Sequence, residues 1–362
     1  MAQYIPTELG TRSIPRLLFQ YAVPAIIAMT AASLYNIVDS IFIGHIGPDG
    51  QWGNSDGMAI SGLALTFPLM NIGAALGAMV GVGASTVISV RLGQREYETA
   101  QHVLGNTVVL NLLLGTLFMV VCLLFLDPIL VVFGASEATL PYARDYMTVI
   151  LLGNVISHSY FGLNAVLRSA GHPEKAMYCT ILTVVVNALL DPLFILVFRW
   201  GTTGAAIATV LGNVVGTAYY LFYCLRRAAV ISLDPKRALA VPGELLSIAA
   251  LGLPNAASTV LSGFASTFSN SLLSQHGTDA IAARAAAGKS SMLISMVQMG
   301  ICMGVQPLLA YCYGAKNLPR LRETLRKLAL LTGGIGLGAV AFCFAFRLFL
   351  ISLFLKEAEV AA

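Results

Sequence analysis

Nine long runs of mainly apolar residues, separated by short polar segments, extend along the chain. A helix that crosses a bilayer needs about 20 apolar residues, because it rises 1.5 Å per residue through roughly 30 Å of hydrocarbon. Each run is long enough for one such helix, so the pattern predicts nine membrane spans. The predicted spans are 17–43, 57–90, 99–126, 146–167, 176–198, 200–225, one within 245–278, 280–312 and 328–346.

The composition agrees with this pattern and narrows the class of protein. Hydrophobic residues make up 57% of the 362 residues and charged residues only 10%, against roughly 25% in soluble domains. A water-soluble enzyme of this size is excluded, and the expected fold is an all-α polytopic membrane protein. The net charge of +4 gives no indication of a nucleic-acid partner. The six cysteines lie in apolar stretches and are interpreted as small buried side chains.

The distribution of Lys and Arg predicts how the spans are oriented. Most of the 21 basic residues fall on one side of the membrane when the N-terminus is placed in the cytoplasm. Basic residues are enriched in cytoplasmic loops, so we expect a cytoplasmic N-terminus and a multi-pass protein of a bacterial inner (plasma) membrane. The first apolar run is too long for a cleaved signal peptide and counts as the first span.

An internal repeat divides the chain. Residues 83–104 align without gaps on 304–325, an offset of 221 positions, and Arg95 matches Lys316 shortly after a shared glycine. Matched helices separated by an even number of spans have the same orientation, which predicts two parallel six-helix lobes. We expect a first lobe at 1–228, a cytoplasmic linker at 229–243, and the first three helices of a second lobe at 244–362. This incomplete second lobe favours a fragment of a longer chain over a naturally short lobe.

Two carboxyl groups lie inside predicted spans, where an ionised carboxylate costs at least about 2.5 to 3.5 kcal/mol. At 1.5 Å per residue, Asp39 is about 8 Å and Asp191 about 12 Å from the outer ends of their spans. Asn187 lies one turn from Asp191 on the same helix face, and Thr209 lies at similar depth in the next span. We therefore expect these four side chains to form one cluster at a common depth.

The chemistry of this cluster suits a coupling ion, with no other cofactor or metal expected. Carboxylate, amide and hydroxyl oxygens are ligands for a hard cation such as Na⁺, which could bind at Asp39 and Asp191. Neighbouring acids in a low dielectric can instead share a proton. The alternative is that each aspartate caps a helix or ends a span; for Asp191 this interpretation is supported by the proline that follows it.

Other residues inside the spans are candidates for a substrate cavity or a hinge. Met292 and Met296 recur on one face of the eighth span, a pattern that fits either close packing or a deformable pocket. Lys289 in the same span either faces a cavity or extends its charged end toward the membrane surface. Pro24 can bend the first span. The full set of cavity candidates is Asn36, Lys289, Met292, Met296 and Gln306.

Six segments of the chain carry a specific pattern of residues. They are YAVPAIIAMTAASLYNIVDSIFIG (21–44), GLALTFPLMNIGAALGAMVGVGASTVISVRLGQ (62–94), GLNAVLRSAGHP (162–173), VNALLDPLFI (186–195), GAAIATV (204–210) and GVQPLLAYCYGAKN (304–317). Together they resemble the multidrug and toxic compound extrusion (MATE) family over almost the whole chain. The resemblance implies a twelve-helix secondary antiporter that exports cationic, amphipathic compounds in exchange for protons or sodium.

The resemblance also assigns roles to individual residues. In the branch of the family with a cation site in its N-terminal lobe, the ion-binding residues fall on Asp39, Asn187, Asp191 and Thr209, and the bending proline of the first helix falls on Pro24. The essential acid that another branch carries in its seventh helix has no counterpart here. The chain is therefore identified as a MATE-like exporter, C-terminally truncated, with its coupling site in the first lobe.

We expect alternating access by a monomer that contacts amphipathic small molecules and the lipid bilayer. A flippase for lipid-linked precursors would share the fold, but its cavity would need several cations for a pyrophosphate, and only Lys289 and Arg284 qualify. A membrane-embedded enzyme would need a catalytic motif. The chain contains neither HExxH nor GxSxG, and its five histidines are scattered along the sequence.

Overall fold

The computed structural model describes residues 8–46, 58–226, 241–274 and 278–345, and within them it contains helices and no strands. Side chains of some residues within α2, α10 and α11 are also outside the description. The helices are α1 Glu8–Thr11, α2 Ile14–Gly44, α3 Met58–Gly93, α4 Tyr97–Leu124, α5 Leu126–Val132, α6 Leu140–Leu152, α7 Asn154–Ser169, α8 Pro173–Pro192, the π-helical turn η1 Leu193–Val197, α9 Gly201–Arg226, α10 Pro242–Ser274, α11 Thr278–Gly314 and α12 Leu318–Ala345.

The predicted all-α membrane fold is confirmed. Eight described helices are long and apolar enough to cross a membrane, and the number is nine when α6 and α7, which meet at a bend of 56°, are taken as one span. The bend lies at Gly153, where an added Cβ would be 2.4 Å from the Val210 side chain of α9. Glycine therefore lets α9 approach the break in this span.

The fourth span begins earlier than predicted. The sequence pattern starts this span at residue 146 because Arg144 and Asp145 are charged, whereas α6 starts at Leu140. Arg144 forms an ion pair with Asp127 of α5, and its Nε donates to Asp127 Oδ1 at 2.8 Å. Because the guanidinium is paired and about half exposed, the charge is tolerated near the start of α6. The helix can therefore begin before Arg144.

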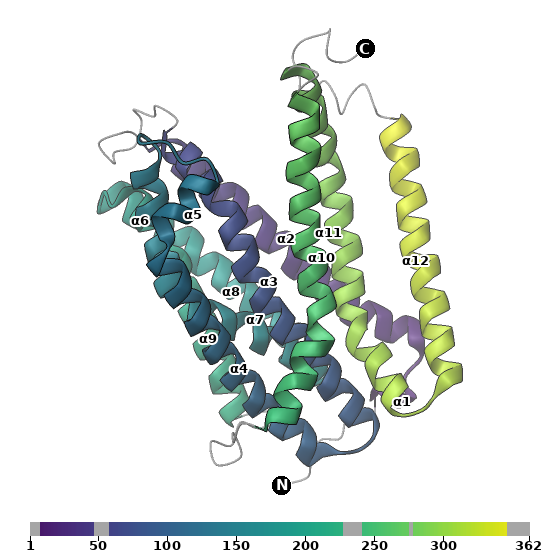
Figure 1. Cartoon of the computed structure of the whole chain (residues 1–362). Helices are drawn as coiled ribbons and strands as arrows, with labels where there is room; N and C mark the ends of the chain where they lie inside the picture. The colour runs from purple at the N-terminus through teal and green to yellow at the C-terminus, as the bar shows by residue number, and fades with distance from the viewer. Residues whose placement is uncertain (1–7, 47–57, 227–240, 275–277, 346–362) are drawn as a thin grey trace.

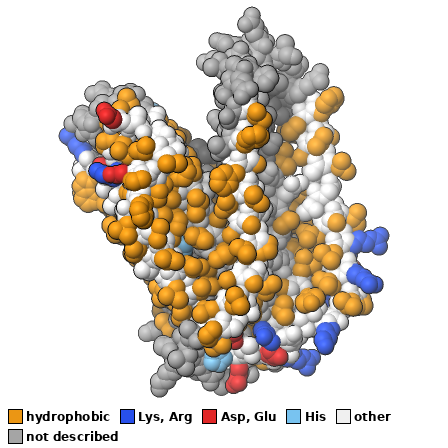
Figure 2. Space-filling model, in the orientation of Figure 1, with side chains coloured by type: hydrophobic (Ala, Val, Ile, Leu, Met, Phe, Trp, Pro, Cys, Tyr) orange, Lys and Arg blue, Asp and Glu red, His pale blue; other side chains and the backbone are white. Residues whose placement is uncertain are grey.

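The helices form two groups, which we call the first group (α2 to α9) and the second group (α10 to α12). Figure 1 shows the two groups approaching each other at the lower end and separating toward the upper end. The apolar core of the first group is built mainly from α3, α4 and α7, and it continues into the second group through Ile248 and Ala256 of α10. The Lys and Arg side chains of the visible face gather mainly at the lower end (Figure 2).

Glycines bring the backbones of the two groups into direct contact. A Cβ added to Gly83 of α3 would lie 1.9 Å from the Ile248 carbonyl oxygen, and one added to Gly252 of α10 would lie 1.9 Å from the Met79 carbonyl oxygen. On the other side of the molecule, a Cβ at Gly304 of α11 would lie 2.5 Å from the Tyr21 carbonyl oxygen of α2. We call these contacts the glycine seam; no side chain could be inserted there without moving the helices apart.

The glycine seam follows the sequence repeat. Gly83 and Gly304, which match at the offset of 221, each pack against a helix of the other group. Gly93 and Gly314 match at the same offset and contact one another, since a Cβ on Gly93 would be 3.1 Å from the Gly314 carbonyl carbon. The pair therefore lies close to an approximate two-fold axis between the groups.

Polar contacts hold the helix ends together below the glycine seam. Asn106 of α4 donates to Glu244 Oε2 at 2.5 Å and accepts a hydrogen bond from the Val241 backbone N–H at 2.9 Å. Arg320 of α12 donates to the Leu9 carbonyl oxygen at 3.1 Å, which ties α12 to α1. The lower end is thus closed by both backbone packing and hydrogen bonds.

Candidate functional site

Two buried carboxyl groups lie inside the first group. Asp39 of α2 and Asp191 of α8 are 5% and 0% exposed, and the two helices pack along one another. The carboxyl groups are close enough for the charge of one to act on the other. Neither forms an ion pair with a cation among the described residues. Within the same residues, Asp39 Oδ1 has no hydrogen-bond partner.

Asn187 links Asp191 to α9. In the amide orientation that satisfies both neighbours, Asn187 Nδ2 donates to Asp191 Oδ2 at 2.9 Å, and Oδ1 accepts from the Thr209 backbone N–H at 3.1 Å. Asn187 is 2% exposed, so these hydrogen bonds replace those lost to water. The structure therefore brings together Asp39, Asn187, Asp191 and Thr209, as the depth argument predicts; we call them the carboxyl cluster.

The backbone next to Asp191 is unusual. The helix does not end there: α8 reaches Pro192 and continues as the π-helical turn η1 to Val197. Proline cannot supply a helical N–H, and widened π turns of this kind are frequent at functional sites. Asp191 therefore does not terminate the span; its carboxyl group faces Asn187 of the preceding turn.

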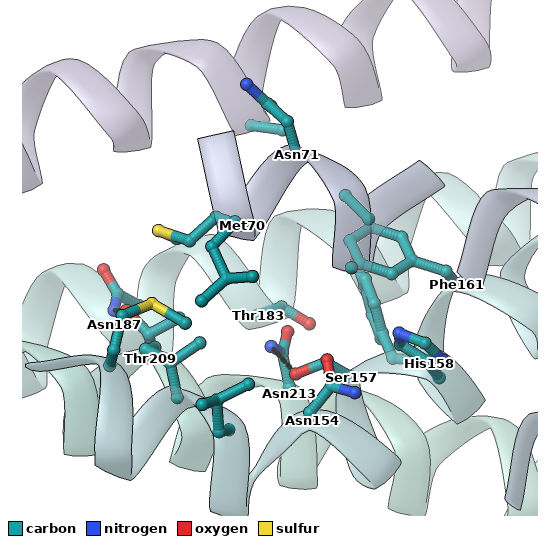
Figure 3. A pocket seen from close by; sticks show the side chains of 18 of the residues that line it. Met70, Asn71, Asn154, Ser157, His158, Phe161, Thr183, Asn187, Thr209 and Asn213 are labelled. Carbon is teal, nitrogen blue, oxygen red and sulfur yellow. Dashed lines mark hydrogen bonds between the residues drawn. The ribbon is translucent and has the colours of Figure 1, made fainter. Parts of the chain in front are cut away.

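A cavity of about 350 Å³ adjoins the carboxyl cluster and shares Asn187 and Thr209 with it. It lies between α2, α3, α4, α6, α7, α8 and α9, and Figure 3 shows its polar side chains. Asn213 Nδ2 donates to Ser157 Oγ at 2.9 Å across it. Among the described residues, its lining contains aromatic and amide side chains but no Lys, Arg, Asp or Glu. The lining residues important for the argument are Met70, Asn71, Phe118, Asn154, Ser157, His158, Phe161, Thr183, Asn187, Thr209 and Asn213.

The cavity differs from the one expected around the eighth span. The side chains of Asn36, Lys289 and Met292 lie outside the described residues. Met296 is half-buried on α11 and does not line this cavity. Gln306 does not line it either; its Nε2 donates to Thr86 Oγ1 of α3 at 2.9 Å and so joins the two groups.

Sequence reasoning missed most of the lining. Asn154, Ser157 and His158 are polar residues in the same turns of one apolar span, and Asn213 follows Thr209 by one helical turn. The helical spacing of these polar residues within apolar spans was the sequence signal that could have predicted the cavity lining. The predicted hinge residue, Pro24, lies within α2, which is helical from Ile14 to Gly44.

The chain matches a known family over most of its length. Residues 24–193 and 254–362 match the family model described as MatE. The multidrug export protein MepA of Staphylococcus aureus (strain NCTC 8325 / PS 47) is 28% identical over 343 residues, which are 95% of this chain and 74% of that protein.

Solved structures of transporters have the same fold. A structure described as MATE in complex with MaD3S has a TM-score of 0.90 and 26% identity, and the match covers 98% of this chain and 78% of that one. The outward-facing conformation of a multidrug resistance MATE family transporter of the MOP superfamily also has a TM-score of 0.90, with 25% identity and coverage of 100% and 79%.

Proposed function

Since the chain belongs to the MatE family of multidrug efflux transporters, we propose that it exports amphipathic, mostly cationic compounds in exchange for protons or sodium ions. Members of this family are transporters and not enzymes, which removes the membrane-embedded enzyme from consideration. We place the protein in a bacterial plasma membrane, with its N-terminus in the cytoplasm.

The observation that carries the proposal is the carboxyl cluster beside the cavity. Two buried carboxyl groups without a basic partner in the described residues require a cation, because a buried uncompensated charge is very unfavourable. A proton can neutralise the pair, and a sodium ion can use the oxygens of Asp39, Asn187, Asp191 and Thr209. Because Asp39 is on α2 and Asp191 is on α8, binding of either ion changes the charge between these two helices and so affects how they pack.

The shape of the molecule supports alternating access. The positive-inside rule assigns the lower end, where Lys and Arg gather in Figure 2, to the cytoplasm. The groups are then closed toward the cytoplasm by the glycine seam and separated toward the outside. In the proposed cycle, a compound enters from the cytoplasm or inner leaflet. An ion that binds the carboxyl cluster from outside then bends α2 at Pro24 and promotes release.

The cavity favours cationic compounds over lipid-linked pyrophosphates. A pyrophosphate carries several negative charges and would need Lys or Arg around it. The described lining contains neither, whereas aromatic side chains and a nearby pair of carboxyl groups suit an aromatic cation. The flippase alternative is therefore less consistent with this cavity than the exporter.

Efflux of ethidium from cells that express the chain, driven by an imposed proton or sodium gradient, tests the proposal. Asp39→Asn and Asp191→Asn keep the shape of each side chain but remove its ionisation, so both are expected to reduce gradient-driven efflux to the background of cells without the protein. The control is Asp127→Asn, which alters a partly exposed ion pair at the end of α6, and should export close to wild type. Wild-type efflux by both cluster variants would overturn the proposal.

A further inference from the structure

A partly buried arginine lies at the end of α7 without a carboxylate partner. Arg168 is in the last turn of this helix, and it takes part in none of the ion pairs among the described residues. Its Nη1 donates instead to Oδ1 of Asn164, one turn earlier. Because α6 begins at the upper end in Figure 1 and forms one span with α7, Arg168 lies toward the lower, cytoplasmic end. The mechanism proposed above makes no use of this permanent charge.

A chain of hydrogen bonds joins Arg168 to the cavity. Asn164 Nδ2 donates to Thr180 Oγ1 at 3.2 Å and to the Tyr220 hydroxyl oxygen at 2.5 Å. The Tyr160 hydroxyl donates to the same Thr180 oxygen at 3.2 Å. Tyr160 and Thr180 line the cavity, which adjoins the carboxyl cluster. Polar groups therefore lead from the cavity wall to the guanidinium, through a region that is otherwise apolar core.

The hydrogen bonds of this chain occupy the oxygens that a cation would need. Thr180 Oγ1 accepts from two donors and donates to the Ala176 carbonyl oxygen at 3.1 Å. Arg168 occupies Asn164 Oδ1, and this contact turns the Nδ2 donor toward the hydroxyl groups. An amide N–H neither accepts a proton nor coordinates a sodium ion. A cation that leaves the cavity by this route therefore meets a donor group first and a fixed positive charge behind it.

We propose that Arg168 is a barrier to the coupling cation. Its charge, together with the Asn164 amide that it orients, keeps a proton or sodium ion at the carboxyl cluster from passing through the first group to the cytoplasm. The cation then leaves when the lower end opens between the two groups, which is the step that admits substrate. Arginine side chains exclude cations from membrane pores by the same repulsion. This inference rests on the proposed function and adds the basis of its coupling between ion and substrate.

Ion leak into proteoliposomes without substrate tests the barrier. A potassium diffusion potential, negative inside, drives cations inward, an enclosed pH dye reports protons, and radioactive sodium reports sodium uptake. Arg168→Gln removes the charge and is expected to raise the leak of the coupling ion roughly tenfold or more, because a nearby unit charge has at least that effect at the effective dielectric of a protein. Arg168→Lys keeps the charge and should stay within about twofold of wild type by the same reasoning. Wild type should leak little more than liposomes without protein.

A second variant is available if Arg168→Gln does not fold. Asn164→Asp keeps the shape of the side chain, and its carboxylate both neutralises Arg168 and offers oxygens to a cation, so this variant should leak as well. Adding Asp191→Asn to either variant should return the leak to the wild-type rate, because the cation no longer binds at the carboxyl cluster. Arg144→Gln is the matched control, since it removes an exposed, paired arginine from the other end of the same span, and its leak should equal that of wild type.

The melting temperature of each purified variant shows whether it has folded. A wild-type leak rate in folded Arg168→Gln or Asn164→Asp would overturn the inference, and so would a leak that persists with Asp191→Asn. An equal leak in Arg168→Lys would also overturn it, because the arginine would then act through packing and not through charge. If efflux depends on Asp39 and Asp191 but neither barrier variant leaks, only the inference fails. If the variants leak as expected but no gradient drives ethidium efflux, only the proposed function fails.

Discussion

At the scale of single residues, Asn187 determines how Asp191 is presented. Its amide donates to the carboxylate and accepts from the backbone of Thr209, so one side chain fixes both the acid and the neighbouring helix. Hydrogen bonds to charged groups are roughly twice as strong as those between neutral groups. Asn187 is therefore a positioning residue for the proposed ion site.

Asn187→Leu should change the ion dependence of transport. The substitution keeps the volume but leaves the Asp191 carboxyl group without its amide donor, so the ion concentration for half-maximal efflux is expected to shift at least several-fold. Asn213→Leu is the matched control, since it removes a hydrogen bond to Ser157 in the same cavity without touching an acid. Efflux measured at a series of sodium concentrations and pH values checks this. An equal shift in both variants would show that Asn187 acts only through general packing.

At the residue scale, the sequence predicted the positions of side chains whose burial in a membrane is energetically unfavourable. Asp39 and Asp191 are acids within spans, and helical periodicity placed Asn187 on the face of Asp191. His158 could not be found in this way, because a lone histidine in an apolar span looks like ordinary core. Its ring packs against Gly77, Gly115 and Phe118, which come from other helices and which only the fold brings together.

At the scale of elements, glycine determines where the helices of the two groups meet. The crossing of α3 and α10 brings Gly83 against Ile248 and Gly252 against Met79, with backbone atoms in contact on both sides. Small residues at helix crossings are the main means by which helices pack closely in membranes. The lengths of the apolar runs predict most helix boundaries. They fail for the fourth span, which was predicted to start too late, because the paired charge of Arg144 lies within the helix.

Gly252→Leu tests the role of this crossing. Its Cβ would overlap the Met79 carbonyl oxygen, so α10 must move away from α3. We expect a lower melting temperature of the purified protein and loss of gradient-driven efflux. Gly263→Leu is the control in the same helix, since a Cβ there would meet no atom of the described residues within 4 Å, and it should keep both properties. A Gly252→Leu protein with wild-type stability and efflux would contradict a structural role for the glycine seam.

At the scale of the whole molecule, the sequence repeat reappears as an approximate symmetry at the lower end. Gly93 and Gly314 touch, and the repeat-related Arg95 and Lys316 both have positive φ angles, of 66° and 54°. Few non-glycine residues adopt this conformation, so the two turns are alike in backbone as well as in position. The sequence predicted this repeat, but not that its matched glycines would meet, because contact between the groups depends on how the helices cross.

Spin labels at Arg95 and Lys316 should report the opening and closing of the lower end that alternating access requires. Alternating access requires the lower end to open when the carboxyl cluster is empty and substrate is present. We expect one short distance between the labels at saturating protons or sodium, and an added longer distance at high pH without sodium in the presence of ethidium. Double electron–electron resonance measures both populations. Labels at Arg95 and Lys175, both within the first group, should keep one distance, and a single invariant distance for Arg95 and Lys316 would contradict the alternation.

The absence of side chains in the glycine seam has a thermodynamic consequence. A surface closed by long side chains freezes their rotamers each time it closes and releases them each time it opens. Gly83, Gly252 and Gly304 have no rotamers to freeze, so closure of the glycine seam itself changes side-chain entropy very little. The closed and open states can then lie near one another in free energy. An exporter that alternates as proposed can therefore use most of the free energy of its ion gradient to move compounds uphill.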